Sequence, residues 1–538
     1  MIMRELAAHT PEGVRDLFGE TLRLQSEAEE RIENVMEEYG YRQIRTPALE
    51  YLDVFAGDEA GNTELFRYND RDGETLVLRP DFTPGIARMA VTHFLDGADA
   101  VRLRYRGNVF NNKRSLSGKL REETQIGAEL YNDASVQADA EVIALAAESL
   151  KTAGLKDVRI CVGHVDYFFG ICEETGLSYA AESELLDAIC DRNKKACVRS
   201  LEKHGVKGNA ADRIAALADY LCDSSDLDAL YKNCVNEKSR NAITRLKALS
   251  DELEKRGVLG QVTFDVGLLN RYRYYTGMVF RAYADGIGEP VARGGRYDDL
   301  LERFGKAAPA VGFMALTDDL ASAITAEKDD YLTIALGKGR LAKKTMELLS
   351  ACGVSCPEME DKDTRKLIFR DEKTKLAFFL AKGPDVPTYV EYKAADLGIV
   401  GADTIIEENR RVCEVLDLGF GKCRMCVCGR PEAAEFLKHR GMIRVATKYP
   451  NIAKDYFYNE RRQTATLIKL NGSVELGPIV GLADVIVDIV ETGSTLRENG
   501  LEVLEEIMPL SARVIANPVS MQLKASRMKE LLGMLSAK

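Results

Sequence analysis

The sequence predicts two domains of different fold class, an α+β domain over residues 1–328 and an α/β domain over residues 329–538. Strand-like and helix-like segments do not alternate regularly in the first part, which favours a mostly antiparallel sheet. In the second part, short apolar strands alternate with helices. A polar segment, 326–330, separates these two patterns of predicted secondary structure. A chain of 538 residues is also too long for a single hydrophobic core.

The first domain is expected to begin with a helix over 21–38, because apolar residues recur there at helical spacing and Gly40 follows its end. A second helix is expected over 135–153. Strand-like segments lie at 41–47, 75–78, 101–105, 158–162, 262–265 and 278–283. Residues 179–256 are rich in Ala, Leu, Lys and Glu at helical spacing, which predicts a helical insertion.

The strands of the second domain are short apolar runs with helices between them. They lie at 332–336, 376–380, 397–400, 423–428, 443–446 and 485–490. The last run is apolar on both faces apart from Asp488, which suits a strand that is covered on both sides.

The composition narrows the class of protein. Apolar residues make up 46% of the chain, and no run approaches the ~20 consecutive apolar residues of a membrane span. The N-terminus lacks the apolar core of a signal peptide, so we expect a cytoplasmic protein. The net charge of -12 argues against a surface that grips nucleic acid non-specifically.

Twelve cysteines are scattered along the chain, with one cluster at Cys423, Cys426 and Cys428. A zinc site needs a second pair of ligands at matching spacing. We therefore expect reduced thiols on a half-buried strand and no protein-held metal.

The most informative motif is Glu491-Thr-Gly-Ser-Thr495, directly after the strand at 485–490. Backbone N–H groups of Gly493, Ser494 and Thr495, together with the hydroxyls, can cradle a phosphate. The carboxylates of Asp488 and Glu491 can accept hydrogen bonds from ribose hydroxyls, so the motif favours a sugar phosphate. The alternative is an ordinary strand-to-helix turn capped by Thr or Ser.

A second turn, Gly337-Lys-Gly-Arg340, follows the strand at 332–336 and precedes a helix. Backbone groups and the cations Lys338 and Arg340 can meet phosphate there. A solvated basic turn is an equally good interpretation of this motif by itself.

Five motifs in the first domain occur in the order seen in class II histidyl-tRNA synthetases, and the first domain resembles this family over residues 41–320. The motifs are Tyr41-Arg-Gln-Ile-Arg-Thr-Pro-Ala-Leu-Glu50, Leu78-Arg-Pro-Asp-Phe-Thr83, Gln125-Ile-Gly-Ala-Glu129, Tyr274-Tyr-Thr-Gly277 and Gly294-Gly-Arg-Tyr-Asp298. The resemblance implies an antiparallel sheet flanked by helices and a dimer interface near Thr46 and Pro47.

The departures from this family concern the cations that hold ATP. Asn111 and Asp319 stand where the family has arginines that grip phosphate, and Asn270 stands at its histidine-specific arginine. Arg273 occupies a family aspartate position. Loss of these cations removes much of the electrostatic stabilisation for adenylate formation, so we expect neither adenylation nor tRNA charging.

The amino-acid pocket of the family is better preserved. The residues that fall on positions contacting histidine are Asp81, Thr83, Gln125, Glu129 and Tyr274. They supply acids for an amino group or imidazole N–H, together with amide and hydroxyl groups. The resemblance implies a histidine sensor, and the alternative is a buried polar network left from ancestry.

The second domain resembles the short form of ATP phosphoribosyltransferase, the first enzyme of histidine biosynthesis, over residues 331–538. The two turns described above carry this resemblance together with Asp385-Val-Pro-Thr-Tyr-Val-Glu391, Ala395-Asp-Leu-Gly-Ile-Val-Gly-Ala-Asp403, Leu416-Asp-Leu-Gly-Phe-Gly-Lys422 and Gly472-Ser-Val-Glu475. Gly337 and Lys382 depart from the family's usual residues.

The resemblance implies two α/β lobes like those of periplasmic binding proteins, with the active site in the cleft. The first lobe is expected over 331–416 plus 505–538, and the second over 417–504. The implied substrates are ATP and phosphoribosyl pyrophosphate, with Mg²⁺ held mainly by substrate phosphates.

The same resemblance implies roles for individual residues. Lys338, Arg340 and Arg365 are the candidates to neutralise the leaving pyrophosphate. Thr492, Gly493, Ser494 and Thr495 are expected to hold the 5′-phosphate, and Glu475, Asp488 and Glu491 to lie near the ribose hydroxyls. Further substrate-binding candidates are Gly339, Asp385 and Asp403.

Together these resemblances predict a fusion of a regulatory module with its enzyme, inhibited by histidine and assembled as a homo-oligomer. A different class of protein is the alternative: a tRNA- or amino-acid-sensing synthetase paralogue with a non-catalytic, solute-binding C-terminal half.

Overall fold

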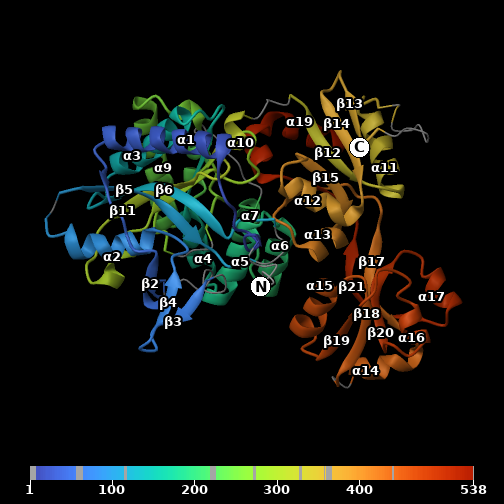
Figure 1. Cartoon of the computed structure of the whole chain (residues 1–538). Helices are drawn as coiled ribbons and strands as arrows, with labels where there is room; N and C mark the ends of the chain where they lie inside the picture. The colour runs from blue at the N-terminus through green and yellow to red at the C-terminus, as the bar shows by residue number, and fades with distance from the viewer. Residues whose placement is uncertain are drawn as a thin grey trace. The chain divides into compact units, whose positions relative to one another are not determined.

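The computed structural model describes residues 8–55, 65–97, 99–113, 118–218, 226–270, 274–325, 330–356, 358, 366–438 and 441–536. The chain divides into two compact units, Met1–Lys328 and Asp329–Lys538 (Figure 1).

The main sheet of the first unit is mostly antiparallel, as the sequence predicts. Within the described residues it has the order β1 (Arg42–Gln43), β5 (Val101–Phe110), β6 (Glu122–Tyr131), β11 (Ala310–Leu316), β10 (Ala292–Arg296), β9 (Met278–Tyr283), β7 (Arg159–His164) and β8 (Val262–Phe264). Only the outermost pairs, β1 with β5 and β7 with β8, are parallel. A small separate sheet contains β2 (Leu49–Tyr51), β4 (Thr75–Leu78) and β3 (Arg67–Asn69).

Helices cover both faces of the main sheet. α1 (Gly19–Glu38), α3 (Val136–Thr152) and α9 (Glu237–Lys255) lie along one face, and α2 (Thr83–His93) lies along the other (Figure 1). Alternation along β5 explains this: Leu103 and Tyr105 are buried with α2, whereas Arg104 on the opposite face bonds Glu37 of α1 at 2.7 Å.

The insertion expected between 179 and 256 is helical in its described residues. It contains α5 (Tyr179–Cys190), α6 (Lys194–Lys203), α7 (Asn209–Ala216), α8 (Leu227–Lys232) and α9, and α4 (Val165–Thr175) precedes it. α10 (Leu320–Thr325) ends the described part of the first unit. No described helix has both the length and the apolar character to cross a bilayer.

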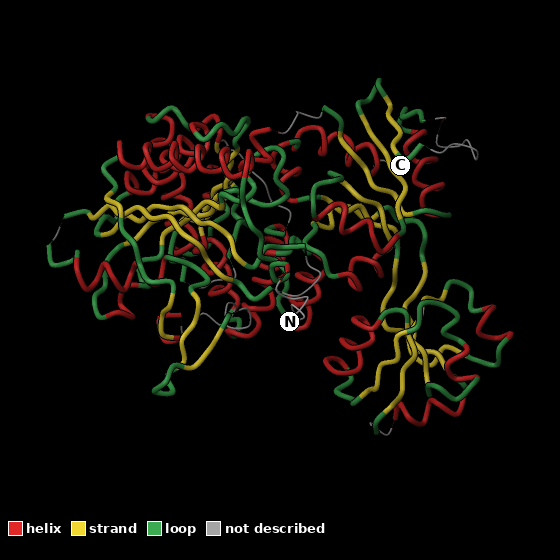
Figure 2. Tube along the Cα trace, viewed as in Figure 1, coloured by secondary structure: helices red, strands yellow, loops and turns green. Residues whose placement is uncertain are grey.

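The second unit contains two sheets, each flanked by helices (Figure 2). The first sheet has the order β13 (Ile368–Asp371), β14 (Leu376–Ala381), β12 (Leu332–Gly337), β15 (Leu397–Gly401), β22 (Ala512–Ala516) and β16 (Cys413–Asp417). The second has the order β19 (Ala465–Lys469), β18 (Ile443–Thr447), β20 (Val485–Val490), β17 (Cys423–Gly429) and β21 (Glu502–Leu510).

The helices of the second unit connect these strands. They include α11 (Arg340–Ala351), α12 (Val386–Glu391), α13 (Ala402–Glu408), α14 (Ala434–Lys438), α15 (Pro450–Lys454), α16 (Leu476–Ile479), α17 (Ser494–Glu498), α18 (Pro518–Leu523) and α19 (Ala525–Ser536). β20 is covered on both sides, as its apolar pattern predicts: Val485 and Val487 pack in one core cluster, and Ile486 and Val490 in another.

One expected boundary is wrong. Residues from 505 onward are expected in the first lobe, but Glu502–Leu510 forms β21, which pairs with β17 in the second sheet. The chain returns to the first sheet only at β22, which pairs with β15 and β16.

Candidate active site and amino-acid pocket

The first set of candidate residues lies where the parallel strands β14, β12 and β15 end. Because carboxyl ends of parallel strands meet at one edge of a sheet, the loops that follow them are neighbours. The turn after β12 is tied to β14 by the Lys338 N–H, which donates to the Ala381 carbonyl at 2.9 Å. Gly339 has a φ of 106°, a conformation that favours glycine, and precedes the exposed Arg340.

Asp385 and Asp403 follow the other two strands of this group. Asp385 is exposed in the short turn Gly383–Asp385, whose Gly383 approaches Gly337 at the end of β12. Asp403 lies in the first turn of α13, directly after β15. Burial raises the pKa of Asp403, although backbone N–H groups and the more distant Lys448 lower it.

The phosphate-cradle motif lies at the corresponding edge of the second sheet. β20 is parallel to β18, which is parallel to β19, so the loops after all three strands are neighbours. Gly493 has a φ of 71°, which favours glycine, and the Thr492 and Ser494 hydroxyls are 3.1 Å apart. Thr492, Ser494 and Thr495 are exposed, so the loop is accessible.

The two turns, 151 residues apart in the sequence, meet at an ion pair. Arg340 Nη2 lies 3.2 Å from Glu491 Oε2. The side chains are 86% and 58% exposed, so the pair contributes little to stability. It does bring the basic turn of the first sheet beside the phosphate-cradle motif of the second.

Asp488 and Glu475 contribute carboxylates near the same loops. Asp488 is half-buried on β20, and burial raises its pKa to about 6, although the Ile489 N–H at 2.8 Å lowers it. Glu475, directly before α16, and Asp403 raise it further, whereas Lys448 lowers it.

Lys448 was not among the candidates. It follows β18 and interacts electrostatically with both Asp403 and Asp488. A lysine after a strand is ordinarily solvated. The signal in the sequence was its place after the predicted strand at 443–446, because ligands of open α/β sheets bind at the carboxyl ends of strands. The next candidate, Arg365, lies outside the described residues.

The amino-acid pocket candidates of the first unit are connected by hydrogen bonds. Thr83 Oγ1 donates to Glu129 Oε1 at 2.9 Å, and the Tyr297 hydroxyl donates to Glu129 Oε2. Gln125 Nε2 donates to Asp81 Oδ1 at 3.0 Å. Four of the five predicted residues therefore form two hydrogen-bonded pairs on β6 and around the start of α2.

The pKa values of the two carboxyl groups among these candidates are raised. Burial raises the pKa of Glu129 to about 8, although hydrogen bonds from Tyr297 and Thr83 lower it. Burial also raises the pKa of Asp81. Tyr274, the fifth predicted residue, contacts the ring of Tyr297 edge-on with ring centroids 6.1 Å apart.

The positions where the family's ATP-gripping arginines would stand carry no cation. Asn111 donates to the Pro80 carbonyl at 3.5 Å, and Asp319 is an acid whose pKa is raised by burial. The cluster Cys423, Cys426 and Cys428 consists of free thiols on β17. In the described part of the chain, no group of three or more His, Cys, Asp and Glu could hold a metal ion.

The fold defines a bipartite protein: a class II synthetase-like unit followed by an α/β unit of two sheets. The family model described as histidyl-tRNA synthetase matches residues 13–320, and that described as ATP phosphoribosyltransferase matches residues 382–537. The chain belongs to both families, the first unit to the histidyl-tRNA synthetase family and the second to the ATP phosphoribosyltransferase family.

Individual relatives agree with this division. The chain is 66% identical over 203 residues to the ATP phosphoribosyltransferase of Lachnoclostridium phytofermentans, covering 38% of this chain and 94% of that protein. It is 35% identical over 332 residues to the ATP phosphoribosyltransferase regulatory subunit of Acetivibrio thermocellus, covering 61% of this chain and 79% of that protein. A crystal structure of an ATP phosphoribosyltransferase regulatory subunit/histidyl-tRNA synthetase from Bacillus halodurans matches with a TM-score of 0.57 and 26% identity, covering 71% of this chain and all of that one.

Proposed function

We propose that the chain catalyses the first step of histidine biosynthesis, the reaction of ATP with phosphoribosyl pyrophosphate to give phosphoribosyl-ATP and pyrophosphate. The observation that carries the proposal is the ion pair between Arg340 and Glu491, because it joins the basic turn to the Thr492–Thr495 loop. Histidine bound to the first unit is proposed to inhibit the reaction.

The chemistry requires charge stabilisation more than proton transfer. Adenine N1 of ATP forms a bond to C1 of the ribose, the bond from C1 to the pyrophosphate oxygen breaks, and that oxygen keeps the electron pair. Because no proton must be removed before attack, no dedicated general base is required. Lys338 and Arg340 are exposed cations beside the loop and are proposed to neutralise the leaving pyrophosphate, with Arg365 as a third candidate.

Substrate binding is assigned to the ends of the parallel strands. The backbone and hydroxyls of Thr492, Gly493, Ser494 and Thr495 would bind the 5′-phosphate. Carboxylates near ribose hydroxyls can accept their hydrogen bonds, a role proposed for Glu475, Asp488 and Glu491. Gly339, Asp385 and Asp403 complete the proposed substrate site from the first sheet.

Magnesium fits this donor set as an ion carried mainly by the substrate. Asp403 in the first turn of α13 and Asp488 on β20 are separate carboxylates, and Mg²⁺ commonly combines one or two carboxylates with substrate phosphates. When bound, it would neutralise charge on the diphosphate. Lys338 and Arg340 would share that task from the protein side.

The two sheets of the second unit support a finer proposal, that it consists of two lobes closing on the substrates as in periplasmic binding proteins. Candidate residues project from the strand ends of both sheets, and the chain passes between the sheets at 418–422 and near Ser511. Closure would exclude water from the reacting groups.

The buried network of Glu129, Thr83 and Tyr297 supports histidine as the ligand of the first unit. Asp81, Gln125 and Tyr274 would complete that pocket. The absence of cations at Asn111 and Asp319 favours amino-acid sensing over aminoacylation. We further propose a cytoplasmic homo-oligomer that does not charge tRNA.

A pyrophosphate-release assay with ATP, phosphoribosyl pyrophosphate and Mg²⁺, with and without histidine, tests the proposal. Gly493→Val should suppress turnover, because a β-branched side chain would occupy a left-handed position where backbone must approach phosphate. Gly481→Val, at a left-handed turn with open surroundings, is the matched control.

Arg340→Ala should also suppress turnover. Lys343→Ala should not, although Lys343 is an equally exposed cation one turn further along α11. Full activity of both Gly493→Val and Arg340→Ala would remove the site assignment. If histidine does not alter pyrophosphate release and the chain binds tRNA, the tRNA-sensing alternative for the first unit would be favoured.

A further inference from the structure

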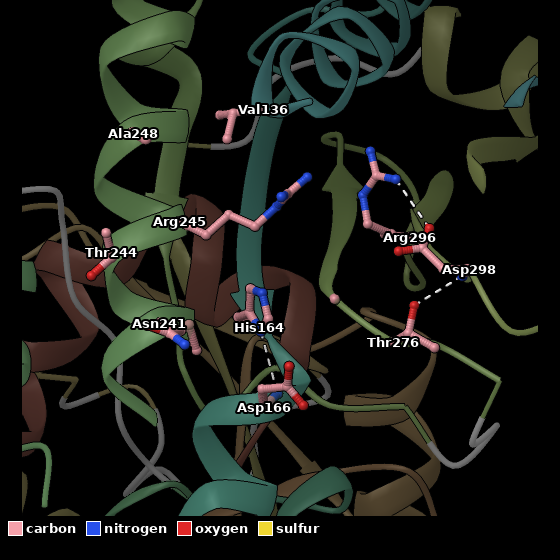
Figure 3. A pocket seen from close by; sticks show the side chains of 12 residues that line it. Val136, His164, Asp166, Asn241, Thr244, Arg245, Ala248, Thr276, Arg296 and Asp298 are labelled. Carbon is pink, nitrogen blue, oxygen red and sulfur yellow. Dashed lines mark hydrogen bonds and ion pairs between the residues drawn. The ribbon is translucent and has the colours of Figure 1, made fainter. Parts of the chain in front are cut away.

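A cavity of about 420 Å³ lies in the first unit, apart from the Glu129 pocket (Figure 3). Its polar lining includes His164 and Asp166 at the start of α4, Arg245 on α9, Thr276 before β9, Arg296 at the end of β10, and Asp298 just after β10. We call it the rear cavity, because Arg296 bonds α3 on one side of the sheet whereas the next residue, Tyr297, packs with α2 on the other.

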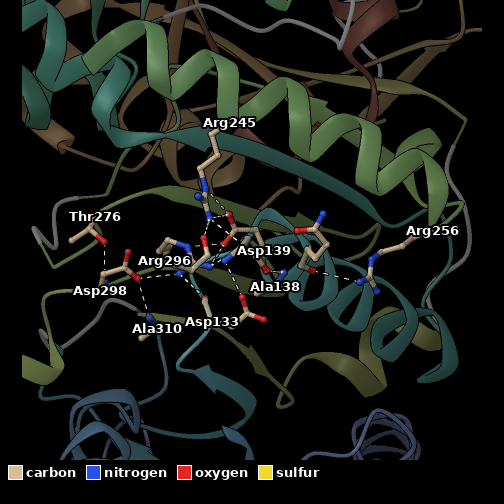
Figure 4. Close-up of polar contacts among 12 residues, drawn as sticks. Asp133, Ala138, Asp139, Arg245, Arg256, Thr276, Arg296, Asp298 and Ala310 are labelled. Carbon is tan, nitrogen blue, oxygen red and sulfur yellow. Dashed lines mark hydrogen bonds and ion pairs between the residues drawn. The ribbon is translucent and has the colours of Figure 1, made fainter. Parts of the chain in front are cut away.

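The cationic end of the rear cavity is built around one buried carboxylate. Asp139 is fully buried and pairs with both Arg245 and Arg296, with Nη2 atoms at 2.5 and 2.6 Å (Figure 4). Arg296 also donates to the Asp298 carboxylate and to the backbone carbonyls of Asp133 and Ser135. One carboxylate thus serves two guanidinium groups.

One side-chain nitrogen of Arg245 has no acceptor among the described residues. Its Nε donates to Asp139, and its Nη2 also donates to the carbonyls of Ala134 and Ser135 at 3.0 and 3.3 Å. No described residue accepts from Nη1. Since Arg245 lines the cavity, this nitrogen can donate to a ligand there.

His164 supplies a second unsatisfied donor. Its Nδ1 accepts from the Asp166 N–H at 3.3 Å, so the proton of the neutral ring is on Nε2. The residue is only 4% exposed, and no described residue accepts from Nε2. Burial, together with Arg245 and Arg296, lowers the pKa of His164 to about 3, so the ring stays a neutral donor near pH 7.

The opposite end of the cavity offers an acceptor. Figure 3 shows Asp166 and Arg245 on opposite sides of His164. The Asp166 carboxylate is partly exposed and its nearest cation is Lys238 at 3.8 Å. A ligand in this cavity therefore meets donors at one end and a carboxylate at the other.

We propose that the rear cavity binds a small α-amino acid as its zwitterion. The ligand carboxylate accepts from Arg245 Nη1 and His164 Nε2, and the ammonium group donates to Asp166. A volume of about 420 Å³ lies within the ~300–1,000 Å³ usual for small-molecule sites. A simple carboxylate or phosphate would make no use of the Asp166 carboxylate, and a simple amine would make no use of the two donors.

A backbone hydrogen bond joins two segments that contribute residues both to the rear cavity and to the surroundings of Glu129. The Thr276 N–H donates to the Arg296 carbonyl at 2.8 Å, and these residues belong to the two segments that carry Tyr274 and Tyr297. If the histidine proposal holds, occupancy of the rear cavity is expected to change histidine affinity. The binding test below does not depend on that.

Equilibrium dialysis of the full chain against each proteinogenic L-amino acid tests the inference, with propionate and inorganic phosphate as single-charge probes. At least one amino acid should bind at one site per chain, and this binding should persist in Glu129→Ala. Ala248→Leu, which fills the cavity from α9 without removing a polar contact, should weaken it by at least about tenfold. Asp251→Leu, on the exposed face of α9, should leave it unchanged.

His164→Gln provides a second variant, and circular dichroism checks that each variant folds. No amino-acid binding to the Glu129→Ala chain would overturn the inference. So would binding that survives both Ala248→Leu and His164→Gln, or propionate or phosphate binding as tightly as the best amino acid. Absence of histidine inhibition in the parent chain, with rear-cavity binding intact, would instead count against the proposed histidine site and not against this inference.

Discussion

Gly312 on β11 lies directly opposite Glu129 on β6, and a Cβ at Gly312 would overlap the Glu129 carboxylate. The glycine does not need an unusual backbone conformation, so its role is to leave space. The buried carboxylate of the amino-acid pocket therefore depends on the missing side chain of a neighbouring strand.

Gly312→Ala should displace the Glu129 side chain and weaken histidine inhibition, while turnover without histidine is retained. Inhibition curves at fixed substrate concentrations measure this effect. Gly260→Ala is the matched control, since a Cβ there meets open space. Unchanged inhibition by histidine in Gly312→Ala would place the histidine site elsewhere.

The protonation of Glu129 should make stability depend on pH. Its pKa of about 8 in the folded chain is above the ordinary value of 4.5, so the folded state binds the proton more tightly. The stabilising contribution is complete below about pH 4.5 and is lost as pH rises through about 8.

Glu129→Gln should therefore gain stability relative to the parent as pH rises from 5 to 9, by a few degrees in melting temperature. Melting curves across this range provide the comparison. Glu30→Gln, an exposed change on α1, should follow the parent at every pH. A constant difference between parent and Glu129→Gln would contradict the raised pKa.

Asp488 should control the acid side of the pH–rate profile. Its pKa of about 6 implies that kcat/KM for phosphoribosyl pyrophosphate rises with pH through about 6, as the carboxylate becomes able to accept from ribose hydroxyls. Asp488→Asn should lower kcat/KM and flatten this limb.

Lys448 lowers the pKa of Asp488, so Lys448→Met should move the midpoint of the same limb to higher pH. Lys454→Met on α15 is the control. Lys454 is an exposed lysine that is not among the groups shifting the pKa of Asp488. A midpoint that is identical in the parent and Lys448→Met would separate Lys448 from the site.

Histidine-dependent exchange of pyrophosphate into ATP should be absent. Asn111, Asn270 and Asp319 do not provide the cations that would stabilise charge on the triphosphate during adenylate formation. An authentic histidyl-tRNA synthetase run in parallel shows that the assay works. Exchange above background in this chain would mean that the motif assignment is wrong.

Local patterns were sufficient to predict the backbone structure of several parts of the candidate active site. The apolar run before Glu491 became β20, covered on both sides, and Gly493 adopts the left-handed conformation that a tight loop after a strand favours. The pairing of Arg340 with Glu491 could not be predicted in this way, because it depends on how two sheets are arranged and not on spacing within either motif.

Strands with weak apolar patterns were missed. β21 contains Glu502, Glu505 and Glu506 and lies at the edge of its sheet, where polar side chains reach solvent, so its sequence does not read as a buried strand. Missing β21 also produced the wrong lobe boundary at 505. Lys448 was missed for a different reason, since its interactions are with carboxylates on other elements, Asp403 on α13 and Asp488 on β20.

The position of β22 has a consequence for synthesis on the ribosome. Ala512–Ala516 pairs with both β15 and β16, so the first sheet of the second unit stays incomplete until residue 516 has emerged from the ribosome. The first unit is contiguous in sequence and can fold long before that. A nascent chain stopped after residue 511 would thus present a folded first unit attached to a second unit whose first sheet still lacks the strand between β15 and β16.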